Sequence, residues 1–189
     1  LAAGLDVLLG VTIAYLMLRT PLPGRQWLDW LATASLAVPG IVLAIGYLRL
    51  YKGVMVPGTD VLLTGTWVAI MLAYAVRRLP YALRSCVAAL QQVHVSLEEA
   101  AESLGADKMR TVRRVVVPLM AGGILAGFVT SFITAAVELS ATLLLTSAES
   151  QAPMSYGIYL YMQSVAGRGP GAALGVLAII VVALDTYLA

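Results

Sequence analysis

The chain has little charge, one cysteine and one histidine. Only 12% of its 189 residues are charged, roughly half the share of about 25% in soluble domains. The single cysteine, Cys86, excludes an intramolecular disulfide and a metal site built on paired cysteines. With His94 as its only histidine, the sequence has no zinc-type His-Glu-x-x-His motif, and it also lacks a Gly-x-x-x-x-Gly-Lys-Ser/Thr phosphate loop. We therefore expect no metal site, no bound cofactor and no catalytic residues on this chain, which is not an enzyme.

Apolar residues are abundant instead. They make up 60% of the chain, and the mean hydropathy is +0.90. A membrane-spanning helix needs about 20 mainly apolar residues, and five segments approach or reach that length: 2–18, 31–48, 61–76, 115–137 and 171–184. This pattern predicts an all-α, polytopic membrane helical bundle of about five spans. Because the chain starts at Leu1 and shows no signal peptide, we expect a piece of a longer protein.

Positive charges are distributed unevenly between the predicted loops. Nine of the twelve fall in the loops after the first and third segments: Arg19, Arg25, Arg77, Arg78, Arg84, Lys108, Arg110, Arg113 and Arg114. The opposite side keeps three: Arg49, Lys52 and Arg168. Cytoplasmic loops of membrane proteins carry an excess of Lys and Arg. We therefore expect the first segment to begin outside and the loop after the third segment to be cytoplasmic.

The cytoplasmic loop contains a charged insert, "EEAAESLGADKMRTVRRVVVPL", from Glu98 to Leu119. Ser96 and Glu99 have the spacing of a capping box, which predicts that a helix starts there. Gly105 is placed to end that helix in the left-handed conformation, and Asp107 to cap a second helix that leads into segment 115–137. The predicted unit is helix, turn and helix beneath the membrane.

The first of these helices has a narrow apolar stripe. Leu97, Ala100 or Ala101, and Leu104 recur at helical spacing, and alanine at the centre lets another surface come close. The stripe indicates docking to a partner protein. Two alternatives stay open on the pattern alone: a helix resting on anionic headgroups, or a basic loop that only sets topology.

The spacing of the insert resembles a known motif. Glu99-Ala100-Ala101, three residues, Gly105, nine residues and Val115-Val116-Val117-Pro118 resemble the EAA motif of ABC-importer permeases, with Val115 and Val117 in place of Ile and Leu. "LATASLAVPGIVLAIGY", "ELSATLLL" and "GRGPGAALGVLAII" are similar to the ferric-iron, thiamine and phosphonate branch of that family. The chain resembles a C-terminal module of this branch.

The resemblance implies a single permease domain over 1–189, of the type I importer kind, with a cytoplasmic coupling region at 77–118. It also implies a bacterial or archaeal inner membrane location. The partners would be a dimer of cytoplasmic ABC ATPases that use the ATP, a second permease module (a homodimer or a fused half), an extracytoplasmic binding protein and lipid, but no nucleic acid. The residues expected to couple to the ATPase are Glu98, Glu99, Ala100, Ala101, Leu104, Gly105 and Pro118.

Two further features are candidates for the translocation pathway. Pro39-Gly40 interrupts segment 31–48, and transporters use broken helices near their binding sites; a packing kink is the alternative. Glu138, with Ser140 and Thr142, follows segment 115–137. These three side chains would provide a polar lining, and an ordinary interfacial charge at Glu138 is the alternative.

A secondary transporter driven by an ion gradient is the rival function. It needs ionisable residues inside the membrane, and only Asp6, Glu138 and Asp185 come near, all towards segment ends. A carrier also gives no reason for the EAA spacing. An ATP-driven importer is therefore favoured, with ferric iron as the preferred substrate among iron, thiamine, organophosphonates and polyamines.

Overall fold

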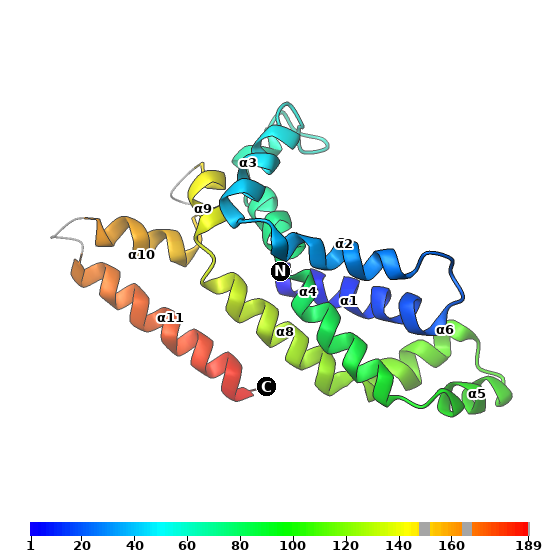
Figure 1. The fold of residues 1–189 in the computed structure, drawn as a ribbon. Coiled ribbons are helices and arrows are strands. Elements are labelled where there is room, and N and C mark those ends of the chain that lie inside the picture. The colour runs from blue at the N-terminus through cyan, green and yellow to red at the C-terminus, as the bar shows by residue number, and fades with distance from the viewer. Residues whose placement is uncertain (148–151, 164–167, 189) are drawn as a thin grey trace.

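The computed structural model describes residues 1–147, 152–163 and 168–188. This part of the chain is helical (Figure 1), and its only β contact is an isolated antiparallel bridge between Met55 and Leu62. The all-α prediction is therefore confirmed. The helices are α1 (Ala2–Arg19), α2 (Gln26–Ala37), α3 (Gly40–Leu50), η1 (Leu63–Gly65, 3-10), α4 (Trp67–Gln92), α5 (Val95–Ser103), α6 (Lys108–Thr111), η2 (Val112–Val116, a π turn), α7 (Val117–Leu119), α8 (Ala121–Ala136), α9 (Ser140–Leu145), α10 (Met154–Met162) and α11 (Arg168–Leu188).

The centre of the bundle is formed by α1, α4 and α8, which lie side by side in Figure 1. α1 and α4 run parallel, because Leu1 lines the same pocket as Trp67 while Arg19 bonds the carbonyl of Leu90. α8 runs antiparallel to α4. Glycine permits the close approach of α1, since a Cβ at Gly10 would lie 3.2 Å from the backbone of α4.

Glycines also bring α8 against α4. A Cβ added at Gly123 would lie 2.3 Å from the Ala89 Cβ, and one at Gly127 would lie 3.2 Å from the Ala82 Cα. This small-xxx-small pair therefore packs two helices of the same chain. A partner module is not needed to explain it.

Two predicted spans are sharply bent. α2 and α3 meet at 109° around Pro39, and the stretch Lys108–Leu119 meets α8 at 70° around Met120. By length and composition, α1 and α11 are long and apolar enough to cross a membrane, and each bent pair would add one more span. α4 has 26 residues, but its three arginines lower its hydropathy. The count of five spans stays a prediction.

Several predicted bounds were wrong. Segment 61–76 was expected to end before Arg77, yet α4 starts at Trp67 and continues through Pro80 to Gln92. The interval between α4 and α8 is therefore 93–120. It overlaps the coupling region expected at 77–118, which stays a prediction. A helix also lies between the expected segments 115–137 and 171–184, because Tyr156, Tyr159 and Tyr161 are on α10.

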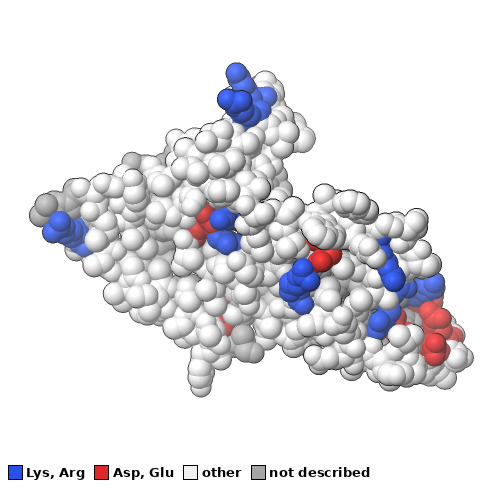
Figure 2. Space-filling view, in the orientation of Figure 1, with Lys and Arg blue, Asp and Glu red and all other residues white. Residues whose placement is uncertain are grey.

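The charged side chains gather mainly at one end of the molecule. Figure 2 shows Lys, Arg, Asp and Glu clustered over α5 and α6, with a few separate spots on an otherwise uncharged surface. Arg77 and Arg78 do not belong to that end, because they lie in the middle of α4. They therefore cannot count towards the charge bias of the cytoplasmic loop, which rests on the remaining residues at the α5–α6 end.

Candidate functional site

The first part of the candidate site is α5, the short helix of the charged insert. It begins at Val95, and its N-cap is His94, whose Nδ1 accepts a hydrogen bond from the Ser96 N–H at 3.3 Å. The capping box predicted at Ser96 is therefore wrong by two residues, because the imidazole supplies the acceptor. His94 is exposed and caps a helix.

The turn after α5 follows the prediction. Gly105 has φ +87°, and its N–H donates to the Glu102 carbonyl at 2.9 Å, while the Ala106 N–H donates to the Ala101 carbonyl at 3.0 Å. This pair of bonds is a Schellman motif, which satisfies the last carbonyls of a helix. Asp107 then caps α6 by accepting from the Arg110 N–H at 2.8 Å. Both turn residues are therefore placed as expected.

The outer face of α5 is uncovered. Leu104 is 90% exposed and Leu97 44%, and Glu99 and Ala100 are exposed as well. Leu97, Ala100 and Leu104 thus form an exposed apolar face on α5, a helix fixed at both ends. The acidic Glu99 lies beside this face. Glu98 differs, because it is buried and faces the bundle.

The helix after the turn does not continue straight into the membrane. Val112–Val116 form a π turn directly before α7, in which Pro118 is exposed and lacks an N–H. The chain then bends at Met120. The predicted second helix, which leads into segment 115–137, is therefore divided into α6, η2 and α7 before α8 begins.

The second part of the candidate site is formed by the residues predicted to line the pathway. The break at Pro39-Gly40 and the segment around Ser140 are 100 residues apart in the sequence, yet a Cβ at Gly40 would lie 2.9 Å from the Ser140 Cβ and 2.7 Å from Arg77 Nη1. Pro39 itself is exposed. Only glycine leaves room for this contact between two breaks, the one at Pro39-Gly40 and the one at 137–139 between α8 and α9, whose contact we call the junction of the two breaks.

Glu138 lies at the second of these breaks and is 5% exposed. Its Oε2 accepts a short hydrogen bond from Arg78 Nη2 and lies 3.2 Å from Arg77 Nε, which forms an ion pair without hydrogen-bond alignment. Arg77 also donates to the Val38 carbonyl at 3.4 Å, at the end of α2. The alternative of an ordinary interfacial charge does not describe Glu138, because it is buried and two arginines of α4 pair with it.

The backbone carbonyl of Glu138 holds further elements together. It accepts hydrogen bonds from the hydroxyls of Tyr74 (3.2 Å), Thr142 (2.7 Å) and Ser155 (2.7 Å). Thr142 is fully buried. In this conformation Glu138 and Thr142 therefore support the junction from inside, and Pro39 is the candidate that faces outward.

Arg77 and Arg78 were missed as site residues by sequence reasoning. They stand where the apolar segment 61–76 stops, which is where positive charge marks a membrane boundary. The apolar residues that continue after Pro80 were a signal that the helix goes on. A second buried acid, Asp6 of α1, accepts a short hydrogen bond from Ser131 of α8, so that one of the acids expected towards segment ends lies inside the bundle.

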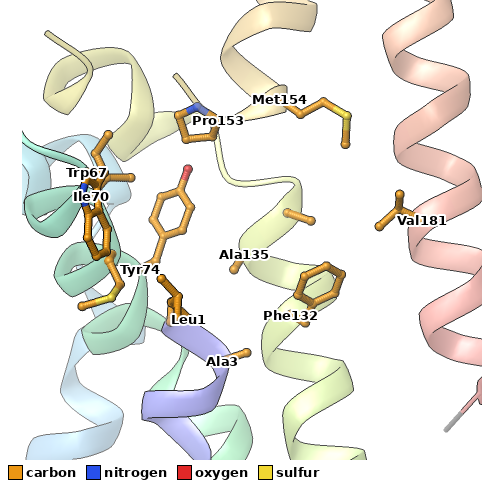
Figure 3. Close-up of a pocket in the computed structure, with 13 residues that line it drawn as sticks. Leu1, Ala3, Trp67, Ile70, Tyr74, Phe132, Ala135, Pro153, Met154 and Val181 are labelled. Atoms are coloured by element: carbon orange, nitrogen blue, oxygen red, sulfur yellow. The ribbon is translucent and has the colours of Figure 1, made fainter. Parts of the chain in front are cut away.

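A pocket of about 360 Å³ lies at the other side of Tyr74 (Figure 3). Leu1, Trp67, Phe132 and Met154 are among its lining residues. Because the lining is mostly carbon, a charged solute would lose hydration there without replacement. Among the described residues, no group of three His, Cys, Asp or Glu could hold a metal ion.

Comparison with known proteins identifies the family of the chain. Residues 6–188 match the family described as "Binding-protein-dependent transport system inner membrane component". The chain belongs to this family. The family consists of membrane transport permeases, and this confirms both the resemblance and the predicted location. It also argues against the secondary transporter.

The chain is similar to two ferric transport permeases and to one molybdenum transporter permease. The chain is 30% identical over 158 residues to the "Ferric transport system permease protein FbpB" of Actinobacillus pleuropneumoniae, covering 82% of this chain and 22% of that protein. A second ferric transport permease named FbpB, from Haemophilus influenzae, is 31% identical over 161 residues (84% and 24%). A protein of Haloferax volcanii named as a molybdenum ABC transporter permease is 34% identical over 140 residues (74% and 52%).

The fold has a solved counterpart. A chain of the MetNI methionine ABC transporter in an inward-facing conformation superimposes with a TM-score of 0.71 at 19% identity, covering 99% of this chain and 85% of that chain. The permease chain thus has the fold of a type I ABC importer subunit. It spans about a fifth of the length of the FbpB relatives that it matches.

Proposed function

We propose that this chain is the permease part of an ATP-driven importer and that α5 docks a cytoplasmic ATPase. The observation that carries the proposal is the exposed face of α5, where Leu104 is 90% exposed on a helix fixed by a cap and a Schellman turn. Glu99, Ala100, Ala101 and Gly105 occupy the EAA spacing along it. An apolar face of this kind is explained by a protein that covers it.

The family description supports the wider assembly. A binding-protein-dependent system requires an extracytoplasmic binding protein, and we propose that a dimer of ABC ATPases hydrolyses ATP outside this chain. A second permease module, either another copy or a fused half, would complete the pathway. The two FbpB relatives are named for ferric transport, which supports ferric iron as the substrate.

The pathway would pass the junction of the two breaks. Pro39 is exposed there and Ser140 is partly exposed, whereas Glu138 and Thr142 hold the junction from behind. Because two arginines already pair with the Glu138 carboxylate, it offers no free negative charge to a cation in this conformation. Gly40, which follows Pro39 at the first break, allows the close approach of Ser140 and Arg77 on which the junction depends.

The test is co-purification of the ATPase with the parent protein. Gly105→Pro demands φ near −65° at a position that has +87° and removes the N–H that bonds Glu102. We expect the ATPase to co-purify in mild detergent with the parent and to be lost from this variant, and Glu99→Lys to weaken its binding.

The matched control is Gly58→Pro. Gly58 has φ +80° but lies in the loop after α3, so the same substitution should leave the ATPase bound. Retention of the ATPase by the Gly105→Pro protein, or equal loss in the control, would contradict docking at α5.

A further inference from the structure

Glu98 and Glu99 are neighbours in α5 but face opposite ways. Glu99 is exposed, whereas Glu98 is 7% exposed and turns towards the end of α1. Its Oε1 accepts a hydrogen bond from Arg19 Nε at 2.6 Å, and its Oε2 accepts one from the Tyr15 hydroxyl at 3.4 Å. Both carboxylate oxygens are therefore occupied within the chain, so that Glu98 is not available to a partner protein.

Arg19 of α1 contacts the end of α4 as well as α5, so that it joins three helices. Its Nη2 donates to the carbonyls of Leu90 at 3.3 Å and Val93 at 2.6 Å, at the C-terminal end of α4. The last carbonyls of a helix have no partner inside it, and a cation is favourable at that end. One guanidinium therefore holds the ends of α1 and α4 and the inner face of α5 at a single point.

This contact is well shielded from water. The side chains of Arg19 and Glu98 are 13% and 10% exposed, so salt screens their attraction less than that of a surface pair. Two short chain connections hold α5, one to α4 through Val93 and His94 and one to α6 through the Gly105 turn, and α5 also packs against η2. Without the ion pair, α5 could tilt on these two short connections while α1 stayed in place.

We propose that Arg19 and Glu98 form a clamp that passes displacement of α5 to α1 and α4 together. This inference rests on the proposed docking of an ATPase at α5. Arg19 and Glu98 are positioning residues in it, because neither touches the solute or the nucleotide. Docking strength depends on the outer face of α5, whereas the clamp sets how much of each ATPase movement reaches the membrane helices.

The experiment uses the complete transporter in liposomes, with its ATPase and binding protein, and measures solute taken up per ATP hydrolysed. Arg19→Gln and Glu98→Gln should each lower this ratio by about threefold or more while the ATPase still co-purifies. The loss in the double variant should be smaller than the sum of the two single losses, because both substitutions remove the Arg19–Glu98 contact. Arg19→Lys, which keeps the charge, should restore part of the ratio.

A milder variant and a control make the test decisive. Tyr15→Phe removes one donor to Glu98 without changing shape, and should give a smaller fall. Arg84→Gln breaks an exposed ion pair with Asp29 between α4 and α2, and should leave the ratio unchanged. If the glutamine variants fail to assemble, the same ratio is measured for Tyr15→Phe and Arg19→Lys. A lowered ratio then supports the clamp, and an unchanged ratio in both refutes it.

Four results would overturn a claim, and they are distinguishable. An unchanged ratio in assembled variants, or a fall in transport that only follows the amount of complex, would refute the clamp and leave docking intact. A double variant whose loss is the sum of the single losses would refute it too. Absence of any ATPase from the unmodified transporter would instead refute the proposed function.

Discussion

At the scale of single residues, the pairing of Glu138 with Arg77 and Arg78 accounts for charge inside an apolar bundle. Arg78 lies 11 residues after Trp67, the first residue of α4, and therefore about 16 Å along the helix. It therefore lies well inside the apolar bundle, where it is 9% exposed. Charges at such depth face the protein interior and pair with one another, as these do.

Glu138→Gln should strongly destabilise the protein, because it leaves two guanidiniums without their carboxylate. Breaking a buried pair on one side costs about 3 kcal/mol or more, and thermal unfolding in detergent would show a clear fall in the midpoint. Asp29→Asn is the control. The Asp29 carboxylate lies 3.3 Å from Arg84, whose side chain is 61% exposed. Loss of such an exposed pair costs about 1 kcal/mol or less. Equal midpoints for both variants would refute the structural role of Glu138.

At the scale of helices, the break between α2 and α3 depends on a glycine that no side chain can replace without movement. In Gly40→Ala, the new Cβ would lie 2.7 Å from Arg77 Nη1 and 2.9 Å from the Ser140 Cβ. Overpacking of this kind costs about 1–3 kcal/mol. We expect lower uptake and a lower unfolding midpoint.

Gly46→Ala is the matched control for that variant, because it lies on the same helix with nothing within 4 Å of its Cβ. Alanine in a helix interior is favoured over glycine by up to about 1 kcal/mol, so this variant should be as stable as the parent or more so. A Gly40→Ala protein with an unfolding midpoint as high as that of Gly46→Ala would show that the two breaks are not in contact.

The contact between α8 and α4 gives a second comparison on a single helix. Gly123→Ala would place a Cβ 2.3 Å from that of Ala89, whereas Gly122→Ala meets nothing within 4 Å. Thermal unfolding should therefore separate these neighbours, with a loss for Gly123→Ala alone. Similar losses in both would contradict the close packing of α8 on α4.

Local patterns predicted some elements well. The mainly apolar run of α1, the break at Pro39-Gly40 and the turn at Gly105 each depend on residues next to one another in the sequence. The extent of α4 could not be predicted in this way. Arg77 and Arg78 inside it are paired with Glu138, which lies 60 residues after Arg78 in the chain, and that is a tertiary effect.

The candidate site shows the same division. The exposed face of α5 followed from helical spacing and from the motif that it resembles, because both are local. The inward direction of Glu98 did not, since it depends on Arg19, which lies 79 residues earlier. A capping imidazole at His94 was missed as well, because Ser96 and Glu99 offered the more familiar pattern.

At the scale of the whole molecule, the charged end with α5 and the junction of the two breaks are distinct regions of one helical bundle. α1 and α4 extend from the pocket beside Leu1 and Trp67 to the clamp at Arg19, so they connect the two regions. An ATPase at α5 would therefore act at a distance on the junction at Glu138, through helices and not through a flexible loop.

The most direct measurement is photo-cross-linking in native membranes. Leu104→Cys places a thiol at a position that is 90% exposed, while the native Cys86 is fully buried, and a photo-reactive reagent is attached to the new thiol. We predict a cross-linked product with the ATPase from this position and none from Met55→Cys, an exposed site in the loop after α3. No ATPase product from position 104, or the same product from position 55, would contradict docking at α5.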